Sequence, residues 1–242
     1  MKIEVFYDVI CSWCRIGKVN LHKAIDKLVK EGKIKEKDLE IVFRGYMIYP
    51  DLPGGSTDVK VNGDHPALVR AQVGGDYKAI QVANDDTADW DPTKSTPLHR
   101  WAKRAGLNFE LTRISVKPNT MQAHQMLYLV REVKPEAFEP LLADMQTAYF
   151  EDGLDMGNLD VICALAKKYV DDVWSLRERV IAGDYVADVK HDTEELGDTK
   201  YDCQLCPMFV FDEKVVLEGA VLQANFEKAL LGEPVSGARI IK

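Results

Sequence analysis

The stretch Asp8-Val9-Ile10-Cys11-Ser12-Trp13-Cys14 stands between two segments of different periodicity. Residues 2–8 alternate between two faces, and a period of two predicts a β-strand. After the stretch, apolar residues recur at the spacing of one helix face, namely at Leu21, Ala24, Ile25, Leu28 and Val29. Gly32 is a natural end for this helix. The first two cysteines therefore lie where a strand turns into a helix.

The same periodicity argument extends along the chain. Residues 39–45 predict a second strand, so the first segment forms a βαβ unit with a parallel strand pair. From about 65 to 196, nearly every apolar run has helical spacing, which predicts a helical bundle. Residues 208–211 and 215–217 predict a hairpin, and a last helix runs from about 222 to 231. The predicted order is β-α-β, helical insert, β-β-α.

Composition excludes several classes of protein. The chain has 242 residues and a formal net charge of −8 at pH 7, which gives no electrostatic footprint for nucleic acid. No apolar stretch approaches the roughly 20 residues that span a bilayer. The first eight residues carry acids at positions 4 and 8 and lack the apolar region of a secretory signal. We therefore expect a cytoplasmic protein with no membrane partner.

Five cysteines are the sharpest feature of the sequence, and four of them form two C-x-x-C pairs. These pairs are Cys11 with Cys14 and Cys203 with Cys206. In a reducing compartment such pairs are typical of redox or metal sites rather than of structural disulfides. Cys163 lies in an apolar helical run and is interpreted as a buried small hydrophobic residue.

The chemistry of thiol exchange assigns roles to the first pair. The thiolate is the attacking species, and the start of a helix lowers a thiol pKa through unpaired N–H groups and the helix dipole. We therefore predict that Cys11 is the attacking thiol and the more exposed and more acidic of the two. Cys14 would resolve the mixed disulfide. Ser12 and Trp13 would touch the thiolate and contact substrate.

The second pair directly precedes Pro207 and the strand at 208–211. Proline cannot donate to a strand ladder and belongs at the first residue of a strand. Four interpretations of Cys203 and Cys206 stay open: a second exchanging dithiol, a disulfide that feeds the first pair, half of a metal site, or two loop cysteines with no joint role.

At several places the sequence resembles the DsbA-like thioredoxin-fold proteins, most of all their cytoplasmic FrnE-like branch. The matching stretches are Asp8-Val9, Cys11 to Lys18, Phe43-Arg44-Gly45-Tyr46, Asn119-Thr120, Tyr149 to Gly153, and Pro207 to Val210. The resemblance implies an α/β thioredoxin fold, residues 1–60 and 197–242, interrupted by a large all-helical insertion, residues 61–196. It also implies a disulfide oxidoreductase that needs no cofactor, with Pro207 in the cis conformation.

Two residues depart from that pattern. Ser12 stands where the branch usually has proline, and Cys206 stands where the family usually has valine or threonine. The loop before Pro207 packs against the attacking cysteine in this fold, so we expect Cys206 within reach of Cys11. We also expect Cys11–Cys14 and Cys203–Cys206 to close as separate pairs that exchange through Cys206.

The residues leave two further functions open. Two C-x-x-C pairs that meet would supply the four thiolates of a zinc or iron–sulfur site. A kappa-type glutathione-dependent transferase or isomerase shares the implied fold, although such enzymes usually carry serine at the position of Cys11. The expected partners are protein disulfides or small disulfides and thiols such as glutathione. A large insertion can supply a dimer face, so the oligomeric state stays open between a monomer and a homodimer.

Overall fold

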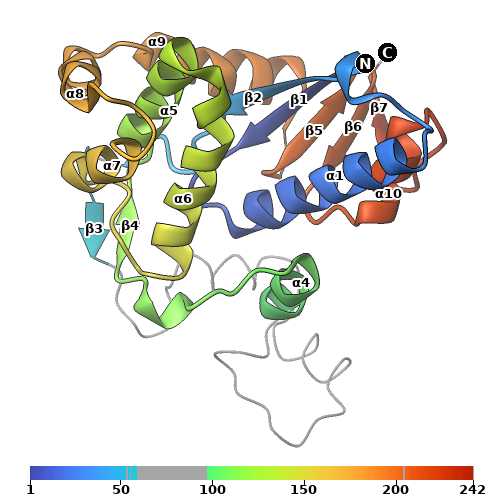
Figure 1. Ribbon diagram of the computed structural model, residues 1–242, viewed down its shortest axis with the longest axis horizontal. Helices are drawn as coiled ribbons and strands as arrows, with labels where there is room; N and C mark the ends of the chain where they lie inside the picture. The colour runs from blue at the N-terminus through green and yellow to red at the C-terminus, as the bar shows by residue number, and fades with distance from the viewer. Residues whose placement is uncertain (53, 55, 59–96, 204, 242) are drawn as a thin grey trace, which may run out of the picture. The chain divides into compact units, whose positions relative to one another are not determined.

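The computed structural model describes residues 1–52, 54, 56–58, 97–203 and 205–241 (Figure 1). The chain divides into two compact units. The first contains Met1–Ile48 and Tyr185–Lys242, and the second contains Tyr49–Asp184. The predicted first boundary, between residues 60 and 61, lies outside the described residues. The return to the first unit comes at Tyr185, twelve residues or so before the predicted position of about 197.

A five-stranded mixed sheet forms the first unit, in the order β2-β1-β5-β6-β7. Its strands are β1 (Lys2–Tyr7), β2 (Glu40–Gly45), β5 (Met208–Phe211), β6 (Val215–Glu218) and β7 (Arg239–Ile240). Strands β1 and β2 are parallel, and the other neighbours are antiparallel. The predicted parallel pair and hairpin are thus confirmed, whereas β7 is an additional edge strand.

Helix α1 (Ser12–Lys30) connects β1 to β2. It buries the predicted apolar face, including Leu21, Ala24 and Leu28. The chain leaves it through Gly32, whose positive φ of 69° favours glycine. Lys27 and Lys30 in the last turn complement the negative end of the helix dipole.

Different layers cover the two faces of the sheet. Helices α1 and α10 (Gln223–Leu230) lie side by side over one face (Figure 1). On that face the rings of Phe209 and Phe226 meet with centroids 4.7 Å apart. The neighbouring residues of β5 point to the opposite face, where Met208 and Val210 join a buried cluster with Tyr201. This is the alternation that a strand buried on both sides requires.

The segment before β5 holds that second face. It contains α9 (Val186–Lys190) and a π-helix, η4 (His191–Lys200). Thr193 Oγ1 accepts from the Met47 backbone N–H at 3.2 Å and donates to the Gly45 carbonyl at 3.3 Å. These bonds fasten η4 to the end of β2, which explains why the first unit resumes before residue 197.

The second unit is mainly helical. The helices in its described part are α4 (Pro97–Ala105), α5 (Met121–Val133), α6 (Phe138–Phe150), α7 (Leu159–Ala166) and α8 (Val173–Ala182). Two short 3-10 turns, η2 (Leu111–Arg113) and η3 (Pro135–Ala137), lie between them. Helix α5 packs against α6, α7 and α8. Asn158 and Asp172 cap α7 and α8 through their side chains.

The described part of the second unit also contains two short strands, and the second of them lies inside the insertion that the sequence predicted to be all-helical. Strands β3 (Ser56–Asp58) and β4 (Val116–Pro118) form a short antiparallel sheet in this unit. A further 3-10 turn, η1 (Glu36–Asp38), precedes β2 in the first unit. Among the helices that the structure describes, none is long and apolar enough to cross a membrane.

Candidate active site

Cys11 is the N-cap residue of α1 and lies in the turn that leads from β1 into this helix. The Cys11 backbone N–H donates to the Asp8 carbonyl at 3.1 Å, which holds the turn. The Cys14 backbone N–H donates to Cys11 Sγ at 3.2 Å. The sulfur of Cys11 thus takes the place of the side-chain oxygen that normally caps a helix. The N–H group that donates to it stabilises the thiolate form.

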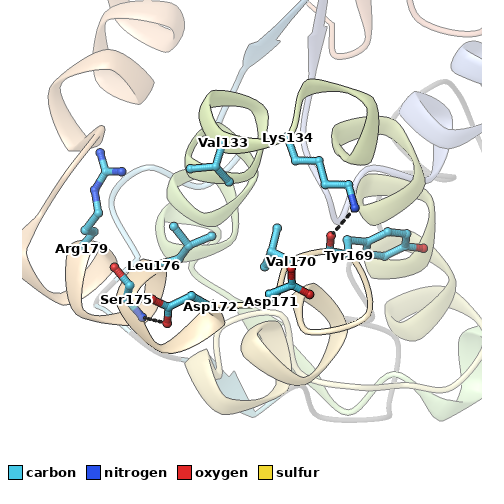
Figure 2. A pocket seen from close by; sticks show the side chains of 9 residues that line it. All are labelled: Val133, Lys134, Tyr169, Val170, Asp171, Asp172, Ser175, Leu176 and Arg179. Carbon is cyan, nitrogen blue, oxygen red and sulfur yellow. Dashed lines mark hydrogen bonds between the residues drawn. The ribbon is translucent and has the colours of Figure 1, made fainter.

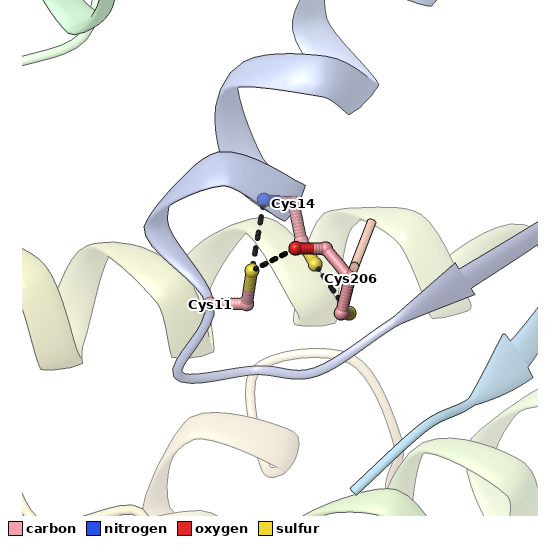
Figure 3. Close-up of side chains that lie close together, drawn as sticks. All are labelled: Cys11, Cys14 and Cys206. Carbon is pink, nitrogen blue, oxygen red and sulfur yellow. Dashed lines mark hydrogen bonds between the residues drawn. The ribbon is translucent and has the colours of Figure 1, made fainter. Parts of the chain in front are cut away.

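A second segment brings a third thiol to the same place. Cys206 precedes β5, and its Sγ lies 3.1 Å from Cys14 Sγ (Figure 3). Its carbonyl oxygen lies 3.5 Å from Cys11 Sγ, which can donate to it. The three Sγ atoms all lie within 4.8 Å of one another. The expectation that Cys206 reaches the first pair is confirmed, and its sulfur contact is with Cys14.

Pro207 follows Cys206 through a cis peptide bond, as predicted. Its carbonyl accepts from the Gly219 N–H at 2.7 Å, which extends the ladder that joins β5 to β6. A Cβ atom at Gly17 of α1 would stand 3.3 Å from Pro207 Cγ and 2.8 Å from the Phe209 ring. Gly17 therefore allows α1 to approach the loop that carries Cys206. A glycine inside a strongly patterned helix is the sequence signal for such a close approach.

Burial is the largest influence on the pKa values of two of the three thiols, those of Cys14 and Cys206. The first turn of α1 contains no acidic residue, and Arg15 follows Cys14 directly. Burial, together with the hydrogen bond to Cys11, raises the pKa of the Cys14 thiol well above its ordinary value. Burial also raises the pKa of the Cys206 thiol, and the neighbouring thiols add to this effect. Cys14 and Cys206 are therefore protonated at neutral pH.

The exposure of the first pair differs from the prediction. Cys11 is 1% exposed and Cys14 is 3% exposed, so the expectation that Cys11 is the more exposed thiol is wrong. The Cys206 carbonyl next to the Cys11 sulfur is one reason for this burial. Ser12 is also buried, whereas Trp13 is partly exposed and offers the larger surface to a substrate.

Cys203 lies apart from the three thiols. It joins the buried cluster of Phe6, Tyr201 and Met208, and its Sγ donates to the Leu205 carbonyl at 3.7 Å. Burial, followed by the charges of Glu218 and Asp198, raises its pKa to about 12. All five cysteines are free thiols in this structure, and the sulfur that Cys206 contacts belongs to Cys14 rather than to Cys203. The closed Cys203–Cys206 pair stays a prediction.

The metal site predicted as an alternative needs four thiolates, and the structure brings three of them together. Among the described residues, the group with metal-ligand geometry contains three thiols, those of Cys11, Cys14 and Cys206. A structural zinc site usually has four protein ligands, and Cys203 does not join this group as the fourth. The four-thiolate set predicted from the two pairs is therefore not assembled.

The second unit contains a hollow of about 360 Å³ between the end of α5 and the start of α8 (Figure 2). Several polar groups of its lining residues have partners within the same unit. Lys134 Nζ donates to the Tyr169 carbonyl at 3.0 Å, and Asp172 accepts from the Ser175 N–H at 3.0 Å. Arg179 forms ion pairs with Glu132 and Asp184. Among the described residues that line the hollow, none is a cysteine.

Comparison with known proteins identifies the family and the fold of the chain. Residues 2–231 match the model of the DSBA-like thioredoxin domain. The chain belongs to this family. The fold class and the resemblance inferred from the sequence are thereby confirmed.

Individual relatives are distant in sequence but cover nearly the whole chain. The uncharacterized protein YwbO of Bacillus subtilis is 22% identical over 237 residues, which are 96% of this chain and 97% of that protein. The probable DsbA oxidoreductase SCO1869 of Streptomyces coelicolor has a TM-score of 0.71 at 23% identity, over 96% of this chain and 89% of that one. The cytosolic disulfide reductase DsbM of Pseudomonas aeruginosa has a TM-score of 0.60 at 14% identity, over 95% and 97% of the two chains.

Proposed function

We propose that this protein is a thiol–disulfide oxidoreductase that acts through Cys11 and Cys14. The observation that carries the proposal is the 3.2 Å hydrogen bond from the Cys14 N–H to Cys11 Sγ at the N-cap of α1. This bond favours the thiolate form of Cys11, and the positive end of the helix dipole acts in the same direction.

The reaction has two exchange steps. The Cys11 thiolate attacks one sulfur of a substrate disulfide, the substrate S–S bond breaks, and the other substrate sulfur leaves as a thiolate. Cys14 then attacks Cys11 Sγ and forms the Cys11–Cys14 disulfide, and the second substrate sulfur leaves with the electron pair and takes up the Cys14 proton. The substrate gains two electrons and the enzyme loses two. When the enzyme starts with the Cys11–Cys14 disulfide closed, the same steps run in reverse and a substrate dithiol is oxidised.

The proposed substrates are protein disulfides and small disulfides such as oxidised glutathione. Support for a glutathione-like substrate comes from DsbM of Pseudomonas aeruginosa, one structure of which is described with GSH. The proposed compartment is the cytoplasm, in line with the cytosolic description of that relative. The oligomeric state stays open, and sedimentation of the purified protein distinguishes a monomer from a homodimer.

Reduction of insulin disulfides and of oxidised glutathione tests the proposed function. We expect activity in the wild-type protein and its loss in Cys11→Ser, whereas Cys163→Ala, a change in the other unit, keeps it. Equal activity of wild type and Cys11→Ser would contradict the proposal. Zinc and iron analysis of anaerobically purified protein addresses the metal alternative, and a stoichiometric metal that blocks alkylation of all three thiols would favour it.

A further inference from the structure

Cys206 is a thiol that the two-step exchange does not use, yet it lies in direct contact with a thiol that does. The Sγ atoms of Cys14 and Cys206 are 3.1 Å apart. A disulfide bond has an S–S distance of about 2 Å, so a shift of ~1 Å would bring the two sulfurs to bonding distance. Figure 3 shows the side chains of Cys11, Cys14 and Cys206 gathered at one point.

The backbone around Cys206 is held in place. The Pro207 carbonyl accepts a hydrogen bond from the Gly219 N–H on one side, and β5 pairs with β1 on the other side. The Cys206 Sγ also donates to the Phe6 carbonyl of β1 at 3.8 Å. The contact with Cys14 is therefore built into the sheet, between residues 192 positions apart in the chain.

We propose that Cys206 is a third redox residue of this site, which forms a disulfide with Cys14 and thereby frees Cys11. The proposal rests on the proposed function, because it starts from the oxidised Cys11–Cys14 pair. Cys206 loses its proton and attacks Cys14 Sγ. The Cys11–Cys14 bond breaks, the Cys14–Cys206 bond forms, and the electron pair leaves on Cys11 Sγ, which takes up the proton or remains a thiolate. One disulfide is lost and one is gained, so no external oxidant or reductant is consumed.

This exchange changes what the enzyme can do with a substrate. With Cys14 bound to Cys206, Cys11 can still attack a protein disulfide, but Cys14 can no longer resolve the mixed disulfide. Another thiol of the same substrate must then attack the substrate sulfur that is bonded to Cys11. That bond breaks, and Cys11 leaves as a thiolate. The result is a rearranged disulfide rather than a reduced one. The substrate class is therefore a protein that carries both a disulfide and a free thiol.

Disulfide mapping of the full chain tests the proposal. Trypsin leaves Cys11 and Cys14 on one peptide, residues 3–15, and Cys203 and Cys206 on another, residues 201–214. Oxidation with diamide, a small thiol oxidant, is followed by blocking of free thiols and mass analysis. In the Cys11→Ser, Cys203→Ala double variant we expect peptides 3–15 and 201–214 to be linked. Free Cys14 and Cys206 in the oxidised, folded double variant would overturn the proposal.

Wild-type protein supplies the second readout. After reaction with oxidised glutathione we expect both the internal disulfide of peptide 3–15 and the link between peptides 3–15 and 201–214. If neither the internal disulfide nor the link between the peptides forms, the result counts against the proposed function. Formation of the internal disulfide without any link between the peptides would overturn only the role of Cys206. The Cys163→Ala variant is the matched control and should give the wild-type map.

Discussion

The sulfur atoms of Cys14 and Cys206 lie 3.1 Å apart, across 192 residues of sequence. One belongs to the first turn of α1 and the other to the loop that enters β5. The contact places a third thiol beside the dithiol of a DSBA-like protein. The two cysteines of the second C-x-x-C pair therefore have different neighbours. Cys206 contacts Cys14, whereas Cys203 packs against Tyr201 and Met208.

Cys206 should influence the balance between isomerisation and reduction. Replacing it by alanine leaves Cys14 free to resolve every mixed disulfide, so we expect less rearrangement of scrambled ribonuclease per insulin disulfide reduced. The two assays on Cys206→Ala and wild type measure this ratio, with Cys163→Ala as control. A ratio unchanged by the loss of Cys206 would argue against its role in rearrangement.

Cys11 should be alkylated before Cys14 in the reduced protein at mildly acidic pH. The Cys14 N–H stabilises the Cys11 thiolate, while burial raises the pKa of the Cys14 thiol. Iodoacetamide labelling followed by peptide fragmentation gives the order. Faster labelling of Cys14 would reverse the assigned roles.

Gly17→Ala should destabilise the fold by about 1–3 kcal/mol, which is typical of overpacking. The new methyl group would stand 2.8 Å from the ring of Phe209, which is fully buried. Urea unfolding measures the effect, and Asp26→Ala at an exposed position of the same helix is the control. Equal stability of Gly17→Ala and wild type would show that overpacking costs no more than the helix propensity that alanine adds, about 1 kcal/mol.

Glu4 should contribute stability that depends on pH. Burial alone would raise its pKa, but hydrogen bonds from Tyr201 and Arg44 and the charge of Arg44 outweigh burial and lower it. A carboxyl with a lowered pKa in the folded state stabilises the protein above its ordinary pKa and loses this contribution as pH falls through the folded value. The stability difference between wild type and Glu4→Gln should therefore shrink below the ordinary value of 4.5. Urea unfolding from pH 7 to about pH 3 measures it, and a difference that stays constant would contradict this assignment.

Periodicity predicted the elements that bury a regular face. The apolar stripe from Leu21 to Leu28 identified α1, and the alternation of residues 2–8 identified β1. In each element the backbone repeat alone decides which side chains share a face. The resemblance added the cis bond at Pro207. The short strands β3 and β4 escaped prediction since three residues are too few to show a period.

The second cysteine pair could not be resolved from spacing. Residues three apart share a face in a helix, but Cys203 and Cys206 lie outside any helix, after a positive φ at Asp202, where spacing does not fix direction. The two side chains therefore turn to different neighbours. Equally, nothing in the local sequence of Cys14 shows which distant thiol it will meet.

The most direct test of the account is to trap the first exchange step on Cys11. In the Cys14→Ser, Cys206→Ser double variant, neither neighbouring thiol can resolve a mixed disulfide. After reaction with oxidised glutathione, we expect one glutathione per chain, on Cys11, identified by mass mapping. An unmodified Cys11 in the folded double variant, or glutathione found only on Cys163 or Cys203, would contradict the claim that Cys11 is the attacking thiol.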